Sequence, residues 1–153
     1  FMALLQMRPD QPEESRAVEW VAYASNAFNT MVPFYANVER TPEYLANTTG
    51  TVSTDNFYWT SRLIAAMADA SYNKSLFHLE RYEEAVLSAA RALVNQYDAK
   101  LAAEPDAARR AALREEANTA IAAMLQEKAA DTLDKVLFEL SSQMKNAYSR
   151  SDA

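Results

Sequence analysis

The stretch STDNFYWTSRLIAAMAD, residues 53–69, separates two kinds of sequence pattern. It opens with three residues whose side chains can accept hydrogen bonds from the free N–H groups of a first helical turn: Ser53, Thr54 and Asp55. Apolar residues then recur every three or four positions and predict one helical face: Trp59, Leu63, Ala66 and Met67. We therefore predict a docking helix between a strand-and-loop segment, residues 1–52, and a helical segment, residues 53–153, in one compact unit.

Two short segments near the N-terminus predict a β-hairpin. Phe1–Arg8 is mostly apolar and stops at a proline, which leaves it too short for a useful helix, so we interpret it as a buried strand. Ala17–Ala24 alternates and predicts a second strand, and the short connection between the two favours antiparallel pairing. A lone hairpin is only marginally stable in water and needs a sheet to join. Ser25–Asn37 mixes small polar residues with aromatic ones, and we interpret Asn26–Tyr35 within it as a loop. The chain offers little further β structure.

The rest of the chain predicts helices: one turn with Thr41 as cap and Pro42 at its first position, a long helix from about Leu76 to Ala102, and a last helix from about Ala107 to Tyr148. A break at residues 71–74 precedes the first long helix, and Pro105 with Asp106 as cap separates the two. The first long helix carries an apolar seam: Leu79, Tyr82, Val86, Ala90, Leu93, Tyr97 and Leu101. The last helix carries another: Ile121, Leu125, Leu133, Val136, Leu140 and Met144. The predicted fold is mainly α with a small β part, a β-hairpin followed by a docking helix and a long antiparallel helical hairpin.

The composition argues against several classes of function. The net charge of −6 is unsuited to nucleic acid, whose binding depends on neutralised phosphates, and no basic patch suits an anionic membrane. No apolar run approaches the roughly 20 residues that span a bilayer. Gly50 is the single glycine, which argues against a glycine-rich phosphate loop. The absence of cysteine excludes disulfides, zinc-thiolate sites and a thiol nucleophile within this chain.

Several residues admit both a structural and a functional interpretation. Arg8 closes a strand and either forms an ion pair at the strand end or contributes to chemistry. His78 is interpreted as a surface or boundary histidine, because no second histidine exists to complete a metal site. The arginines of residues 109–116 are followed by two glutamates, which favours a solvated helix with local ion pairs. Six aromatic residues are interpreted as core in preference to a pocket lining: Trp20, Phe28, Phe34, Tyr35, Tyr58 and Trp59.

Several extended runs taken in order resemble one family. They are Leu5–Pro12, Val18–Ala24, Phe28–Tyr35 and Ser53–Asp69. Together they resemble the C-terminal portion of the cysteine-type dipeptidases of the dipeptidase A group, relatives of the secernins within the N-terminal-nucleophile hydrolases. The resemblance is dense from residue 5 to about residue 97 and rests on no catalytic signature.

The resemblance implies an αββα sandwich in which an N-terminal cysteine is the nucleophile and its own α-amino group is the base. The implied reaction is hydrolysis of dipeptides through an acyl-enzyme, with no metal and no cofactor. Because this chain has no cysteine, it is expected to be the C-terminal segment of such an enzyme and inactive alone. Its expected partners are the remainder of the parent chain, the dipeptide substrate and further copies in a homo-oligomer, with no nucleic acid and no membrane, in the cytoplasm. The alternative is a non-catalytic helical module for oligomerisation or interaction.

The resemblance also suggests site residues. In the wider family an arginine from a late core strand reaches the active site, and Arg8 is the candidate for that role. It would orient the nucleophile or bind the substrate carboxylate through both of its terminal nitrogens. The loop from Asn26 to Tyr35 would shape the rim of a dipeptide pocket, with Asn26, Phe28 and Tyr35 as substrate-binding candidates.

Overall fold

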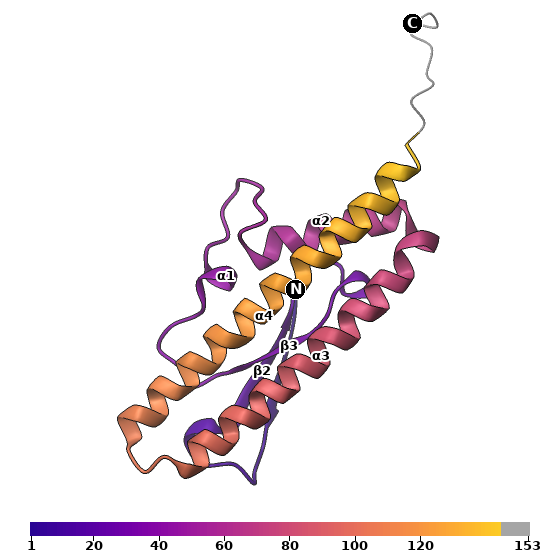
Figure 1. The fold of residues 1–153 in the computed structure, drawn as a ribbon. Coiled ribbons are helices and arrows are strands. Elements are labelled where there is room, and N and C mark those ends of the chain that lie inside the picture. The colour runs from indigo at the N-terminus through magenta and orange to yellow at the C-terminus, as the bar shows by residue number, and fades with distance from the viewer. Residues whose placement is uncertain (145–153) are drawn as a thin grey trace, which may run out of the picture.

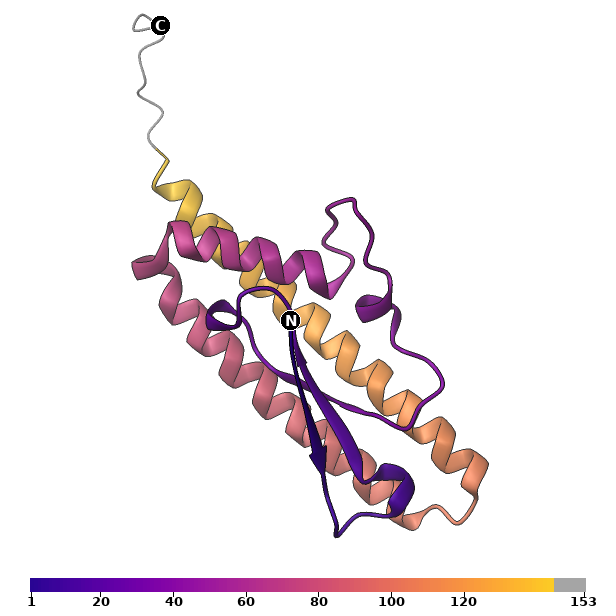
Figure 2. The same cartoon turned by 180° about the vertical axis from the view of Figure 1, so that it is seen from behind.

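The computed structural model describes residues 1–144, except for the side chain of Asn26. Three strands, β1 (Met2–Met7), β2 (Ala17–Ala22) and β3 (Val32–Tyr35), form an antiparallel sheet in the order β1-β2-β3. The predicted hairpin of the first two strands is confirmed, with Leu4 opposite Trp20. Figures 1 and 2 show this small sheet against two long helices, so the predicted fold class, mainly α with a small β part, is also confirmed.

β3 lies within the segment that was predicted to be a loop, so that prediction is wrong. All four residues of β3 are buried, and Val18 of β2 lies opposite Tyr35. The outer edge of β3 is covered by α4: the Asn118 side chain accepts from the Tyr35 N–H at 2.8 Å and donates to the Tyr35 carbonyl at 3.0 Å. An amide side chain from 83 residues away thus replaces a neighbouring strand.

The prediction that the first strand is buried is also wrong for this chain. Every residue of β1 is exposed, including Leu4 at 58%, Leu5 at 61% and Met7 at 58%. β1 pairs with β2 along one edge only, and the order of the sheet leaves its other edge open. The apolar side chains of β1 therefore face solvent.

The helices are α1 (Glu43–Ala46), α2 (Phe57–Ala70), α3 (Tyr72–Ala103) and α4 (Ala107–Ser142), with short 3₁₀ turns η1 (Glu13–Ser15) and η2 (Asn26–Phe28). In both views α3 and α4 lie side by side, joined at one end by residues 104–106, and α2 lies along the other half of α4 (Figures 1 and 2). The predicted helical hairpin is confirmed. No helix in the described part of the chain combines the length and the apolarity needed to cross a membrane.

Two details of α2 differ from the prediction. Its cap is Asn56, whose side-chain oxygen accepts from the Trp59 N–H at 2.9 Å, and not one of the three preceding residues. Its buried face is also rotated from the predicted one and consists of Phe57, Thr60, Ser61, Ile64, Ala65 and Ala68. This face was missed because Thr60 and Ser61 count as polar, although the Thr60 hydroxyl is satisfied within the chain by the Asn56 carbonyl at 2.8 Å.

The ends of the other helices agree with the prediction only in part. α3 begins at Tyr72, so the predicted four-residue break shrinks to Ser71. Asp106 caps α4 as predicted, accepting from the Arg109 N–H at 2.7 Å. The predicted cap Thr41 is wrong, because Pro42 occupies that position and no side chain caps α1. α4 ends at Ser142, and residues 145–148 of its predicted span lie outside the described residues.

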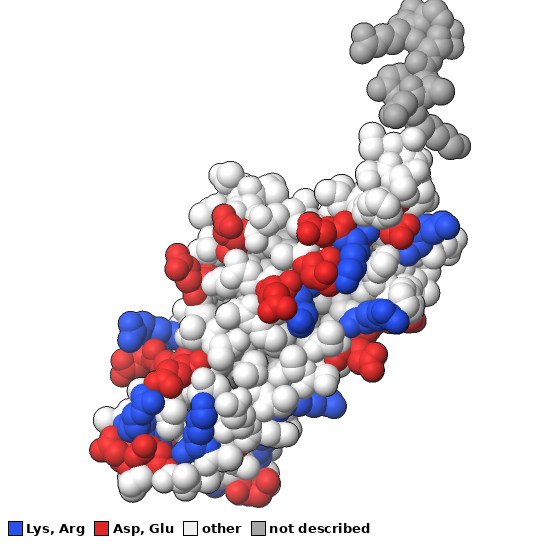
Figure 3. All heavy atoms as spheres, in the orientation of Figure 1, with Lys and Arg blue, Asp and Glu red and all other residues white. Residues whose placement is uncertain are grey.

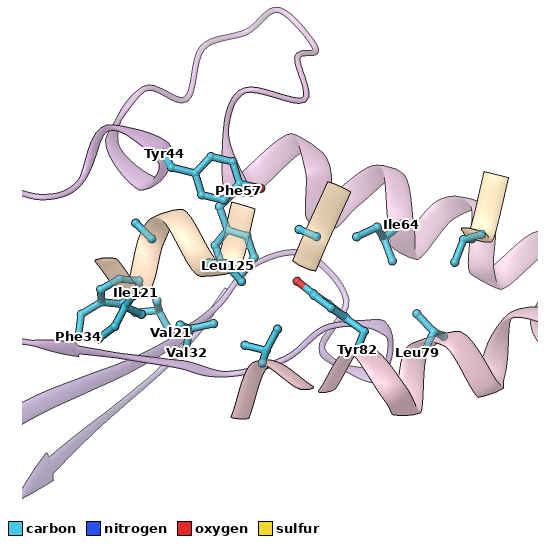
Figure 4. Close-up of a cluster of buried hydrophobic side chains, with 14 of the residues drawn as sticks. Val21, Val32, Phe34, Tyr44, Phe57, Ile64, Leu79, Tyr82, Ile121 and Leu125 are labelled. Carbon is cyan, nitrogen blue, oxygen red and sulfur yellow. The ribbon is translucent and has the colours of Figure 1, made fainter. Parts of the chain in front are cut away.

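The core lies where the sheet meets α2, α3 and α4, as Figure 4 shows. The sheet contributes Val21, Val32 and Phe34, and the helices contribute apolar side chains from every side: Tyr44, Phe57, Ile64, Leu79, Tyr82, Ile121 and Leu125. Most of the predicted seam of α3 is buried, and Leu93 and Tyr97 are half-buried. Packing along the apolar seam and packing against the sheet therefore both stabilise the helical hairpin.

Candidate functional site

Arg8 lies just after β1 and forms an ion pair with Asp98 of α3. Its Nη1 donates to Asp98 Oδ2 at 2.6 Å, and its Nη2 donates to Asp98 Oδ1 at 3.2 Å and to the Ser15 carbonyl at 2.6 Å. Both side chains of the pair are 14% exposed. The two terminal nitrogens are therefore engaged within the chain, and the interpretation of Arg8 as a partner in an ion pair at a strand end is confirmed.

Tyr35 joins this pair from β3. Its hydroxyl donates to Asp98 Oδ1 at 2.7 Å, and the Arg8 guanidinium carbon lies 5.5 Å from the centre of its ring. Burial and the neighbouring Asp98 raise the pKa of Tyr35 above its ordinary value. We name Arg8, Asp98 and Tyr35 the clasp, because these side chains connect the ends of two strands to the C-terminal part of α3.

Of the four predicted site residues, the structure brings two together and places two elsewhere. Arg8 and Tyr35 meet at Asp98, near the end of the sheet where β1 turns into η1. Asn26 and Phe28 belong to η2, which follows the opposite end of β2. Phe28 packs edge-on against Tyr72 of α3 at 6.2 Å between ring centres. The Asn26 side chain lies outside the described part of the structure. The roles proposed for these four residues stay predictions.

A cleft of about 360 Å³ lies between η2 and α2. Phe28 lines it together with six residues: Ala24, Ser25, Arg62, Ala65, Ala66 and Asp69. Ala24 has a left-handed backbone with a φ of 58°, which costs a non-glycine residue roughly 1–2 kcal/mol. This strained position turns the chain from β2 towards η2, and such strain is found preferentially at functional sites.

Arg62 and Asp69 are the charged groups of this cleft, and sequence reasoning missed both. Arg62 is exposed, and its guanidinium carbon lies 5.7 Å from the Tyr58 ring centre and 6.0 Å from the Trp59 ring centre. Neither Arg62 nor Asp69 has an ion-pair partner among residues 1–144. Their spacing of seven residues was the available signal, since it places them on one helical face.

The remaining charged candidates have structural partners. His78 lies 3.4 Å from Glu139 through Nε2 and is 23% exposed, which confirms a boundary histidine. Arg109 pairs with Glu116 at 2.6 Å, as predicted for that run. Arg114, in contrast, is buried and donates to the Asn37 carbonyl at 2.9 Å, so that part of the solvated-helix prediction is wrong. Figure 3 shows acidic and basic side chains interspersed on the face that carries α3 and α4.

Within the described residues, no group of three or more histidine, cysteine, aspartate or glutamate side chains could hold a metal ion. The sequence contains no cysteine. The clasp joins elements of the fold, and the η2–α2 cleft presents an arginine and an aspartate to solvent. The geometry therefore suits binding and positioning.

Comparisons with known proteins relate the chain to a peptidase family. Peptidase family C69 matches residues 1–85, which hold the sheet, α1, α2 and the first part of α3. A probable dipeptidase A of Streptococcus pyogenes serotype M18 is 42% identical over 150 residues, which cover 98% of this chain and 31% of that protein. A dipeptidase of Bifidobacterium longum is 35% identical over 188 residues, covering 99% of this chain and 35% of that protein.

A shorter match, 41% identical over 69 residues, relates the chain to a dipeptidase A of Lactobacillus helveticus and covers 45% of this chain and 14% of that protein. The chain thus spans about a third of the length of the curated relatives that match nearly all of it. The resemblance seen in the residue runs is confirmed by these matches. Since the family match extends over more than half of its residues, the chain belongs to peptidase family C69.

Proposed function

We propose that this chain is the C-terminal segment of an enzyme that hydrolyses dipeptides. The observation that carries the proposal is the 42% identity, over 98% of the chain, with a probable dipeptidase A. The proposed nucleophile is an N-terminal cysteine supplied by the rest of the parent protein, because this chain contains no cysteine. Alone, the chain is therefore expected to be inactive.

In this proposal the chain docks on the rest of the parent protein through β1. The strand exposes apolar side chains on both faces, and no described strand lies along its outer edge. We assign this edge to a strand from the remaining two thirds of the parent, since the relatives are about three times as long as this chain. Pairing there would place Leu4 and Leu5 inside a larger sheet and remove their apolar surface from water.

The proposed reaction is amide hydrolysis through an acyl-enzyme. The α-amino group of the cysteine takes the proton of its thiol, and the sulfur attacks the peptide carbonyl. The amino group then gives this proton to the leaving amine, and water releases the acyl group by hydrolysis of the thioester. Arg8 is proposed to orient the strand end that supports this site. Its two terminal nitrogens are held by Asp98 and Ser15, which favours this role over direct binding of a substrate carboxylate.

The test compares the parent protein with this chain. N-terminal sequencing and a dipeptidase assay, run with and without a thiol-alkylating reagent, are expected to show an N-terminal cysteine and cleavage that alkylation abolishes. This chain alone is expected to give no cleavage. A parent without such a cysteine, or with cleavage that resists alkylation, would overturn the proposal.

The role of Arg8 has its own test in the parent enzyme. Arg8→Lys keeps the charge and loses the planar pair of donors, so kcat is expected to fall while KM changes little. Arg109→Lys, at an exposed pair on α4, is the matched control. Normal turnover of Arg8→Lys would remove Arg8 from the mechanism.

A second candidate function is a helical module for self-association. The observation in its favour is the group of apolar side chains exposed near the end of the helical hairpin that lies opposite residues 104–106: Tyr72, Phe77, Leu137 and Phe138. We propose a dimer or a higher oligomer, to be tested by sedimentation at high concentration. A strictly monomeric profile would exclude it. The cytoplasmic location expected from the resemblance stays a proposal.

A further inference from the structure

Arg62 and Asp69 occupy the same cleft from two turns of α2 and carry opposite charges. Both are exposed, both line the cleft, and neither is paired with a charged group of the described chain. The two opposite charges lie on one helical face, and they are too far apart along the helix to neutralise each other. They give the cleft one positive end and one negative end. A ligand with complementary charges at its two ends matches such a cleft.

The surroundings of each group favour the ligand end of opposite charge. Asp69 lies in the last turn of α2, which contains no basic residue, so the negative end of the helix dipole adds to its attraction for a cation. The Arg62 guanidinium lies beside the rings of Tyr58 and Trp59, and its side chain is exposed to solvent. A planar guanidinium donates two parallel hydrogen bonds to a carboxylate. An ammonium therefore fits at Asp69 and a carboxylate at Arg62.

The dimensions of the cleft limit the length of the ligand. Seven residues of helix rise about 10.5 Å, while an extended dipeptide spans about 7 Å and a tripeptide about 10 Å. In the structure the Arg62 guanidinium lies over Tyr58 and Trp59, on the side away from Asp69. Because Arg62 is exposed, its side chain can leave these rings and turn towards Asp69, which shortens the separation to the length of a dipeptide. The cleft volume of about 360 Å³ also suits a ligand of this size, and Phe28, Ala65 and Ala66 supply apolar wall for its side chains.

We propose that the cleft between η2 and α2 binds the two free ends of a short peptide, the carboxylate at Arg62 and the α-ammonium at Asp69. The choice of a peptide as ligand rests on the proposed function, and the two assignments rest on the geometry. The site would select peptides with both ends unblocked. Phe28 thereby keeps a place in substrate binding, beside two residues that the sequence did not indicate.

The test measures binding of the dipeptide Ala-Leu, its N-acetyl form and its C-terminal amide to the 153-residue chain by NMR titration. Free Ala-Leu is expected to bind with a Kd in the millimolar range and to shift the amide signals of η2 and α2. Each blocked form is expected to bind roughly fivefold more weakly, the effect of losing one exposed charge pair. Absence of saturable binding would overturn the proposal.

Two variants assign the ends. Arg62→Gln is expected to abolish the preference for carboxylate over amide and to keep the preference for the free amine. Asp69→Asn is expected to do the reverse. Arg81→Gln is the matched control, because Arg81 also rests on an aromatic ring, that of Phe77, at 4.2 Å, and lies away from the cleft. The assignment is contradicted if a single variant loses both preferences. It is also contradicted if both variants keep both preferences.

The same variants in the parent enzyme separate this inference from the proposed function. If the cleft feeds the reaction, Arg62→Gln raises KM and leaves kcat unchanged. If the parent cleaves no dipeptide but this chain still binds peptides with the expected charge preferences, the dipeptidase proposal is refuted and the cleft proposal is not. A parent that cleaves dipeptides with unchanged KM in both variants, together with no selective binding here, would refute the cleft alone.

Discussion

Of the three clasp residues, Asp98 is the one whose removal should lower the free energy of unfolding most. It accepts hydrogen bonds from Arg8 at 2.6 and 3.2 Å and from the Tyr35 hydroxyl at 2.7 Å. Asp98→Ala leaves the Arg8 guanidinium, 14% exposed, without its counter-charge, and the Nε of Arg8 is already buried without a partner. Removing one partner of a buried pair costs about 3–5 kcal/mol, and the residual exposure lowers our expectation to about 2–4 kcal/mol.

The assay is equilibrium unfolding of the 153-residue chain in urea, followed by far-ultraviolet circular dichroism. With an m-value of about 2 kcal/mol/M, the midpoint should fall by about 1–2 M. Asp131→Ala is the control, because it removes an exposed pair with Lys135 at 2.6 Å and should cost less than about 1 kcal/mol. The double variant Arg8→Leu/Asp98→Leu should regain most of the loss, since no charge is then left unpaired.

Asp98→Ala that costs no more than Asp131→Ala would refute this reasoning. So would a double variant that is as unstable as the sum of its single variants, because the two residues would then act independently. Either result would mean that the ion pair is worth no more than an ordinary surface pair.

Three further predictions follow from buried or exposed groups. Burial raises the pKa of three tyrosines, Tyr35, Tyr44 and Tyr82, above the ordinary value of about 10. Above about pH 10 the folded chain therefore keeps protons that the unfolded chain releases. The free energy of unfolding should keep its full value below about pH 10 and fall as the pH rises above it. Urea midpoints at pH 8 and pH 11 check this, and equal midpoints contradict it. Asn118→Leu should lose about 2–4 kcal/mol in urea unfolding, because it leaves the backbone N–H and carbonyl of Tyr35 unsatisfied, while Gln126→Leu on the exposed side of α4 should change stability little. Leu5→Lys should change the stability of this chain by less than about 0.5 kcal/mol, because Leu5 is 61% exposed, yet in the parent enzyme it should lower soluble yield and activity. A fully active, soluble parent variant would contradict docking through β1.

The features that were predicted correctly depend on neighbours in the sequence. The apolar seam of α3 repeats every three or four residues over about six turns, so its helix and its buried face follow from local spacing. Asp106 caps α4 through the N–H of Arg109, three residues away. The β1–β2 hairpin is closed by a short connection. In each case the partner lies within reach of the local chain.

The features that were missed depend on distant partners. β3 exists as a covered strand because Asn118, 83 residues away, hydrogen-bonds to both backbone groups of Tyr35. The buried face of α2 includes Thr60, which a hydrophobicity pattern counts as polar, although its hydroxyl donates to the backbone carbonyls of Thr54 and Asn56. Asp98 was not singled out, although it pairs with Arg8 across 90 residues.

Four features could be predicted from the residues alone: the helical hairpin, the first two strands, the absence of a thiol nucleophile and the resemblance to the dipeptidases. They depend on periodicity, capping residues, composition and residue runs, which are properties of the amino-acid order. Only the tertiary structure decided the third strand, the rotated face of α2, the exposure of β1 and the residues that meet in the clasp and the η2–α2 cleft. The physical reason is that buried polar groups need partners, and folding alone determines which distant groups come within hydrogen-bonding distance.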